Sequence, residues 1–157
     1  MASVLVLYYS RTGNTEKMAK IIADELKVKG QDATLKVITD VKVDELEAVD
    51  GLIIGSPTYY GTMAAQIKTL LDETVKIHGK LDGKVGGAFS SAANIAGGNE
   101  ITILDIINAM LIHGFIIQGD PKGSHYGPVA IGAPDDRAEK ECKRFADRFA
   151  NLLSTIY

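Results

Sequence analysis

The sequence predicts a single α/β domain over residues 1–157, a three-layer sandwich in which helices cover both faces of a five-stranded parallel sheet with the order 2-1-3-4-5. Short apolar runs alternate with segments of helical spacing along the whole chain, which is typical of βαβ units joined by right-handed crossovers. The 157 residues suffice for one hydrophobic core and are too few for a (β/α)₈ barrel. No linker or internal repeat divides the chain.

The first half of the chain contains three of the five expected strands. Residues 4–9 are a nearly continuous apolar run, typical of a strand buried on both faces. Residues 35–38 interleave polar side chains and indicate a more exposed second strand, and residues 49–54 are the third, ending at Gly55-Ser56-Pro57. Between the first two strands, apolar side chains recur at helical spacing, at Met18, Ile21, Ile22 and Leu26. Gly30 follows as the expected end of that helix.

The second half continues the same alternation. It predicts a helix over 63–75, a strand over 85–89, a helix over 104–111, a strand over 115–118 and a helix over 138–152. Asp135 and Asp136 are expected to begin the last helix as an acidic N-terminal cap. Cys142 falls on the apolar stripe of that helix, which indicates a buried core residue rather than a nucleophile.

Composition and charge exclude several classes of function. The net charge is −3, and no cluster of Lys and Arg is long enough to follow a phosphate backbone, so we expect no nucleic-acid partner. No run of about 20 apolar residues is present, so we expect no membrane insertion. A single cysteine permits no intramolecular disulfide and indicates a reducing compartment, and no leader sequence is evident. We therefore expect a cytoplasmic protein.

The predicted topology places a ligand site beyond the carboxyl ends of the first, third and fourth strands, where the strand order reverses. The first loop there is Ser10-Arg11-Thr12-Gly13-Asn14-Thr15. Its short polar side chains, together with the N–H groups and dipole of the helix that follows, suit a phosphate. It is neither a Walker loop nor a G-x-G-x-x-G loop. The alternative is an ordinary N-capping turn, and Arg11 could contact phosphate or solvent.

The other two loops differ in composition. In Pro57-Thr58-Tyr59-Tyr60-Gly61-Thr62, two adjacent aromatic rings can stack on a flat ligand, although we expect one of them to pack under the next helix. The segment from Ser90 to Gly98 is rich in small residues and hydrogen-bond donors. It either lines a polar ring edge or is only a mobile loop.

The strand, the loop from Ser10 to Thr15 and the following helix closely resemble the FMN phosphate loop of flavodoxins. The resemblance covers essentially the whole chain in element order and implies a flavodoxin-like fold with FMN as cofactor. It implies that the first loop holds the phosphate and that the other two flank the isoalloxazine ring. The cofactor-binding residues expected from it are Ser10, Arg11, Thr12, Gly13, Asn14, Thr15, Pro57, Thr58, Tyr59, Tyr60, Gly61, Thr62, Ser90, Ser91, Ala92, Gly97 and Gly98.

The segments around 57–63, 90–100, 113–114 and 126–127 also resemble the flavoproteins once named tryptophan repressor-binding protein, which are type IV NAD(P)H:quinone oxidoreductases. This likeness implies that His113 and Tyr126 lie over or beside the flavin as catalytic residues, from the same or a neighbouring subunit, and it leaves a homo-oligomer open. Two alternatives stand beside it. His113 could be an imidazolium at a helix end, and Tyr126 could serve only in packing.

Two functions fit such a flavoprotein. One is an FMN-dependent NAD(P)H:quinone oxidoreductase, with NAD(P)H and a quinone as its partners. The other is a non-enzymatic electron carrier, a short-chain flavodoxin that serves a redox protein partner. A carrier usually presents a strongly acidic face, whereas 20 acidic residues here stand against 17 basic ones. The absence of Trp also removes a common flavodoxin stacking residue. Both observations favour the enzyme.

Overall fold

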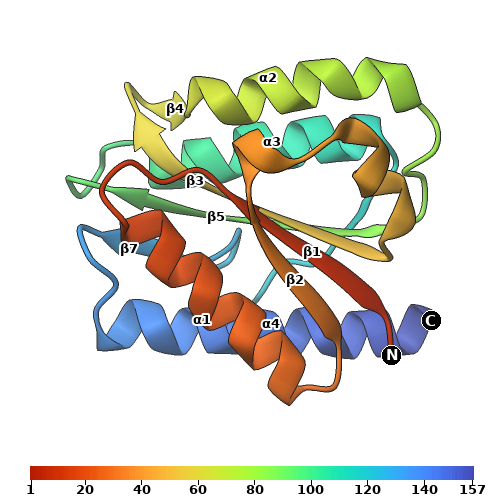
Figure 1. Ribbon diagram of the computed structural model, residues 1–157. Coiled ribbons are helices and arrows are strands. Elements are labelled where there is room, and N and C mark those ends of the chain that lie inside the picture. The colour runs from red at the N-terminus through yellow and green to blue at the C-terminus, as the bar shows by residue number, and fades with distance from the viewer.

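The computed structural model describes all 157 residues as a three-layer α/β sandwich, which confirms the predicted fold class (Figure 1). The strands are β1 (Ser3–Tyr8), β2 (Asp32–Val37), β3 (Gly51–Tyr59), β4 (Thr62–Met63), β5 (Val85–Ala92), β6 (Ile116–Ile117) and β7 (Val129–Ile131). The helices are α1 (Asn14–Val28), α2 (Ala65–Glu73), α3 (Asn99–Ile112) and α4 (Asp136–Ile156). Short 3₁₀ turns lie at Ile38–Asp40, Val43–Ala48 and Thr74–Ile77.

The main sheet is parallel, with the order β2-β1-β3-β5-β6. Counted along the chain, these are the five strands that the sequence predicts, in the predicted order. Two short strands were not predicted. β4 pairs antiparallel with the end of β3, and β7 pairs with the last residues of β5, from Ser90 to Ala92. β6 pairs only with the first residues of β5, so the fifth position of the sheet is divided between β6 and β7.

The prediction that the third strand ends at Gly55-Ser56-Pro57 is wrong, because β3 continues to Tyr59. Gly55 is a packing residue and does not form a turn. A Cβ atom at this position would lie 2.0 Å from the ring of Phe89, which fills the space above the glycine. Pro57 is tolerated near the end of the strand, where it pairs with Ser91.

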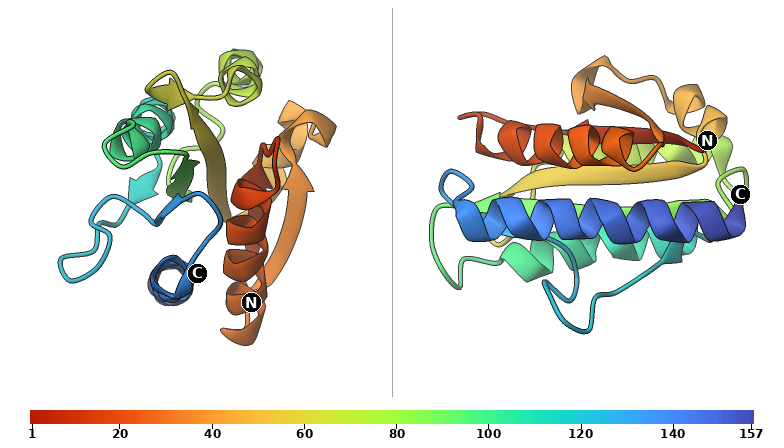
Figure 2. Two further views of the ribbon diagram at one scale, coloured as in Figure 1. Left: turned by 90° about the vertical axis from the view of Figure 1, so that its left-hand side faces the viewer. Right: turned by 90° about the horizontal axis from the view of Figure 1, so that it is seen from below.

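Alternate side chains of the central strands enter two separate cores. Val4, Val6 and Tyr8 of β1 pack with α1 and α4, whereas Leu5 and Leu7 pack with α2 and α3. Figure 2 shows these helix pairs on opposite faces of the sheet. Burial on both faces explains why the sequence of β1 is almost continuously apolar.

The helix ends also follow the sequence. Gly30 lies just past α1 with φ of 80°, and α4 begins after Asp135. Cys142 is completely buried, and burial raises the pKa of its thiol to about 12, which fits a core residue. No helix is long and apolar enough to cross a membrane.

Candidate functional site

The three predicted loops meet at the carboxyl edge of the sheet. The parallel register of β3 and β5 sets Ser56 beside Ser90 and Pro57 beside Ser91, so the second and third loops leave the sheet as neighbours. The Thr15 and Ser91 hydroxyls are 2.8 Å apart and join the first loop to the third. The rings of Tyr9 and Tyr59 meet edge to face, with centroids 6.5 Å apart, and join the first loop to the second.

The first loop leaves the N-terminus of α1 open. Gly13 is the N-cap residue, with φ of 94°, and no side chain caps the helix. The Ser10 hydroxyl accepts a hydrogen bond from the Gly13 N–H (3.0 Å), which folds the loop back on itself. The first N–H groups of a helix have no intrahelical partner and carry a partial positive charge. Because Gly13 has no side chain to occupy this position, the cradle fits a phosphate group.

The side chains of the first loop divide by exposure. Thr15 is buried and hydrogen-bonded to Ser91, whereas Arg11 and Thr12 are exposed. The Arg11 guanidinium is close enough to Tyr59 to act on its phenol, although burial of the ring is the larger effect and raises the pKa of Tyr59.

The second loop is a β-hairpin, which the sequence did not predict. Thr58 pairs with Met63 and Tyr59 with Thr62, leaving Tyr60-Gly61 as a two-residue turn. Both turn residues have positive φ, 50° and 83°, as in the turns that suit tight hairpins. Tyr59 is half-buried against the core beneath α2 and α3, and Tyr60 is fully exposed. One tyrosine thus packs inward, as expected, and the other is free to contact a ligand.

The third loop leads into α3. The Ser90 hydroxyl donates to the Asn99 carbonyl (2.9 Å), so Ser90 and the buried Ser91 hold the loop through their side chains. The backbone of Gly98 packs against Gly61, since a Cβ at Gly98 would lie 2.9 Å from the Gly61 Cα. Ala93 to Gly97 are exposed, and Ile95 is 83% exposed. The second and third loops therefore form one continuous rim.

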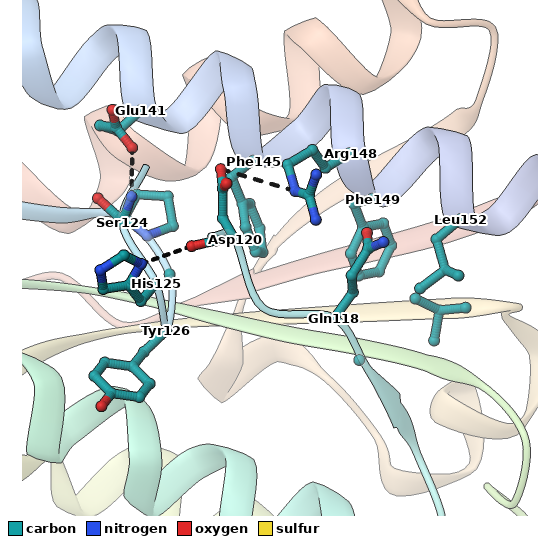
Figure 3. Close-up of a pocket in the computed structure, with 14 residues that line it drawn as sticks. Gln118, Asp120, Ser124, His125, Tyr126, Glu141, Phe145, Arg148, Phe149 and Leu152 are labelled. Carbon is teal, nitrogen blue, oxygen red and sulfur yellow. Dashed lines mark hydrogen bonds and ion pairs between the residues drawn. The ribbon is translucent and has the colours of Figure 1, made fainter. Parts of the chain in front are cut away.

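Tyr126 lies in the segment that joins β6 to β7. Asp120 anchors this segment to α4 by accepting two hydrogen bonds from the Arg144 guanidinium (2.5 and 2.8 Å), and Arg144 holds the pKa of that carboxyl well below its usual range. Glu141 accepts a hydrogen bond from the Ser124 N–H. In Figure 3, Tyr126 points away from α4. It is 52% exposed and lies two residues before Pro128, whose carbonyl accepts from the Ser90 N–H.

His113 is not brought to these loops. It follows α3 at the opposite edge of the sheet, where neighbouring Gly114 accepts a hydrogen bond from the Gly83 N–H, just before β5 begins. The strand between Lys84 and Ser91 spans roughly 23 Å at the usual rise per residue. The expectation that His113 lies beside the flavin of its own chain is therefore wrong.

His113 is not an imidazolium at the helix end either. His113 is buried, and its Nε2 lies 2.7 Å from Thr74 Oγ1. Because the Thr74 hydroxyl donates its only proton to the Leu71 carbonyl, it accepts the hydrogen bond from His113, whose Nε2 carries the proton. His113 Nδ1 is buried without a partner. Burial, with a smaller contribution from His78, lowers the pKa of His113, so the ring is neutral near pH 7.

Four further residues organise the site, and the sequence pattern did not identify them as site residues. Ser56 accepts a hydrogen bond from the Ala64 N–H (2.9 Å) and closes the base of the hairpin, and Tyr9 packs on Tyr59. Thr102 and Asp105 of α3 bond to the two strands of the hairpin. The sequence contained one signal for Asp105, a carboxylate in the middle of a largely apolar helix.

Comparisons with known proteins identify relatives over the whole chain. The family model described as flavodoxin matches residues 6–93. A protein named flavodoxin from Aquifex aeolicus is 36% identical, over 98% of this chain and 88% of its own. A protein named NAD(P)H dehydrogenase (quinone) from Sinorhizobium fredii is also 36% identical, over 95% and 93%. The solved structure of a flavodoxin, WrbA-like protein from Agrobacterium tumefaciens has a TM-score of 0.85 at 25% identity, over 100% of both chains.

Proposed function

This chain belongs to the flavodoxin family, and we propose that within the family it is an FMN-dependent NAD(P)H:quinone oxidoreductase. Family membership confirms the predicted cofactor, FMN. Equal identity to a protein named flavodoxin and to one named quinone dehydrogenase leaves the choice of function to the residues around the site.

The observation that carries the proposal is the charge of the rim. Across the loops 10–15, 57–62 and 90–98, Arg11 is the only charged residue, and one carboxylate, Asp105 of α3, borders them through its bond to Thr62. The exposed apolar side chains nearby are Tyr60, Ile95 and Tyr126. A carrier that docks on basic redox partners needs carboxylates around its cofactor. Three open loops with little charge, which carry an exposed tyrosine and one guanidinium, instead suit a nicotinamide nucleotide and a flat, uncharged quinone that bind in turn.

In the proposed enzyme, the bound FMN supplies the redox chemistry by accepting a hydride and passing electrons on, and the protein positions it. The N–H groups of Asn14 and Thr15 and the hydroxyls of Ser10, Thr12 and Thr15 would hold the phosphate. The backbone of Tyr60, Gly61 and Thr62 would lie along the reactive edge of the ring. Tyr59, Ser91, Ala92, Gly97 and Gly98 would flank it, and Pro57 and Ser90 would fix the loops. Tyr126 would border the open face, where a substrate stacks.

The proposal is tested by anaerobic mixing of the FMN-loaded protein with NADH or NADPH, followed in the flavin absorbance. The expected result is full bleaching by at least one nucleotide and catalytic turnover when a benzoquinone is added. A protein that is bleached by dithionite but by neither nucleotide would overturn the proposal and support a carrier. Failure to bind about one equivalent of FMN per chain would contradict the cofactor itself.

A further inference from the structure

The hairpin from Thr58 to Met63 is too small to hold its own shape. It contains two residue pairs, and both turn residues have positive φ. An isolated hairpin of this length is not stable in water. Tyr60 at its tip is fully exposed and contributes no packing. The conformation of Tyr60-Gly61 must therefore be fixed by contacts made outside the turn.

Besides the Ser56–Ala64 bond at its base and the Gly98 backbone against Gly61, helix α3 supplies one hydrogen bond to each strand of the hairpin. The Thr102 hydroxyl donates to Thr58 Oγ1 (3.1 Å) on β3, and the Thr62 hydroxyl donates to Asp105 Oδ2 (2.5 Å) on β4. Thr102 and Asp105 are three positions apart and so lie on the same face of the helix. The helix is thus hydrogen-bonded to the hairpin on both sides of its turn.

Asp105 has no other evident structural task. It is half-buried, forms no ion pair, and has the Thr62 hydroxyl as its only side-chain partner. A second carboxylate, Asp72, lines the same groove between α2 and α3, but it is exposed and pairs with Lys68. A carboxylate accepts a stronger hydrogen bond than a neutral group does. The charge of Asp105, which no cation neutralises, therefore strengthens its hydrogen bond to the Thr62 hydroxyl of the hairpin.

We propose that Asp105, assisted by Thr102, is a positioning residue that locks the Tyr60-Gly61 turn in the conformation presented to the flavin, and so sets how readily the bound FMN is reduced. This inference rests on the FMN site of the proposed function, but it does not require that NAD(P)H or a quinone is the substrate. Loss of the bond from Thr62 to Asp105 frees the turn, and loss of the charge also removes a negative group near the ring.

The first test measures backbone amide hydrogen exchange at Tyr59 and Thr62, which pair across the turn, in Thr62→Val and Asp105→Asn, with and without FMN. Because a hydrogen bond to a charged group is lost or weakened, we expect exchange to be about tenfold faster in both variants. Thr62→Ser keeps the hydroxyl and should restore the slow exchange. Matched controls are Asp72→Asn, which removes an exposed carboxylate from the same groove, and Thr69→Val on α2. Both should behave like the unaltered protein.

The second readout is the midpoint potential of the bound FMN, with the rate of its reduction. Asp105→Asn should raise the potential, and Thr62→Val should shift it measurably, whereas Thr62→Ser and Asp72→Asn should not. Unchanged exchange in Thr62→Val and Asp105→Asn would overturn the lock. Faster exchange with an unchanged potential would overturn the positioning of the flavin and leave only a local structural bond. If neither nucleotide reduces the unaltered protein, the reductase proposal fails alone, since exchange and potential still decide this one.

Discussion

Helices α1 and α4 both begin at the carboxyl edge of the sheet, yet their N-termini are built differently. At α4, Asp135 is the N-cap, and its Oδ1 accepts a hydrogen bond from the Ala138 N–H (2.8 Å). At α1, Gly13 is the N-cap, and no side chain accepts from the helix. One helix thus satisfies its own terminal N–H groups, and the other leaves them to a ligand.

The difference shows what separates a capping turn from an anion site. Both turns contain a short polar residue of a type that commonly caps helices, Asn14 at α1 and Asp135 at α4, so the presence of such a residue does not by itself separate them. At α4 a carboxylate already occupies the position that a phosphate would take, and it would repel one. At α1 the Ser10 hydroxyl is bonded to the loop itself, and Thr15 is bonded to Ser91. The side chains there shape the cradle without filling it.

The largest effect should come from making α1 resemble α4. Gly13→Asp places a carboxylate at an N-cap with open space around its Cβ. Repulsion of the phosphate dianion should weaken FMN binding by about 100-fold or more. Titration of the apoprotein with FMN, followed by flavin fluorescence, measures the change.

Gly13→Asn is the matched control, because asparagine has the same shape and tolerates the positive φ without adding charge. It should lose far less affinity. Riboflavin, which lacks the phosphate, should bind Gly13→Asp and Gly13→Asn equally. Equal loss of FMN affinity in both variants would show that backbone strain and not charge is responsible, and the comparison with α4 would then fail.

Removal of the cap at α4 should lower the stability of the protein without changing its affinity for FMN. Asp135→Ala removes the cap and should lower the free energy of unfolding by about 1 kcal/mol. FMN affinity measured under the same conditions should be unchanged. A clear loss of FMN affinity in Asp135→Ala, with α4 still folded by circular dichroism, would mean that the two helix ends are not independent.

The order of elements and the place of the site could be predicted from the sequence because both depend on local patterns. Continuous apolar runs, typical of strands buried on both faces, identify β1, β3 and β5. Because these strands are parallel, the loops that follow them meet at one edge of the sheet. The hairpin and β7 were missed because strands of two and three residues carry too little pattern, whereas β6, which is as short, was predicted from its place after a helix in the alternation of elements. The bonds from Thr102 and Asp105 depend on how α3 is rotated against β3, which only tertiary packing decides.

The error on His113 has a different origin. A likeness between short motifs gives residue identities but not the edge of the sheet on which they lie. Helix length did carry that information, since 14 residues of α3 carry the chain about 21 Å from Asn99 to the opposite edge. Tyr126 lies on the same edge as the three loops, because its segment returns to β5 beside Ser90.

The smallest effect concerns this opposite edge, where α3 ends on a neutral imidazole. The folded protein holds the pKa of His113 below its ordinary value, mainly through burial, and the unfolded chain does not. The unfolded state therefore binds more protons as the pH falls below about 6.5, the ordinary histidine pKa. Stability from His113 is fully present above that pH and decreases as the pH falls through it.

His113→Gln should remove this part of the pH dependence, because an amide can still donate to Thr74 Oγ1 but takes up no proton. Urea unfolding at a series of pH values between 5 and 8 measures the slope, which cannot exceed about 1.4 kcal/mol per pH unit for one proton. His125→Gln, which removes an exposed imidazole from the segment before β7, should retain the contribution of His113. If His113→Gln loses stability toward acid as steeply as the unaltered protein does, then His113 is not the group whose protonation destabilises the fold.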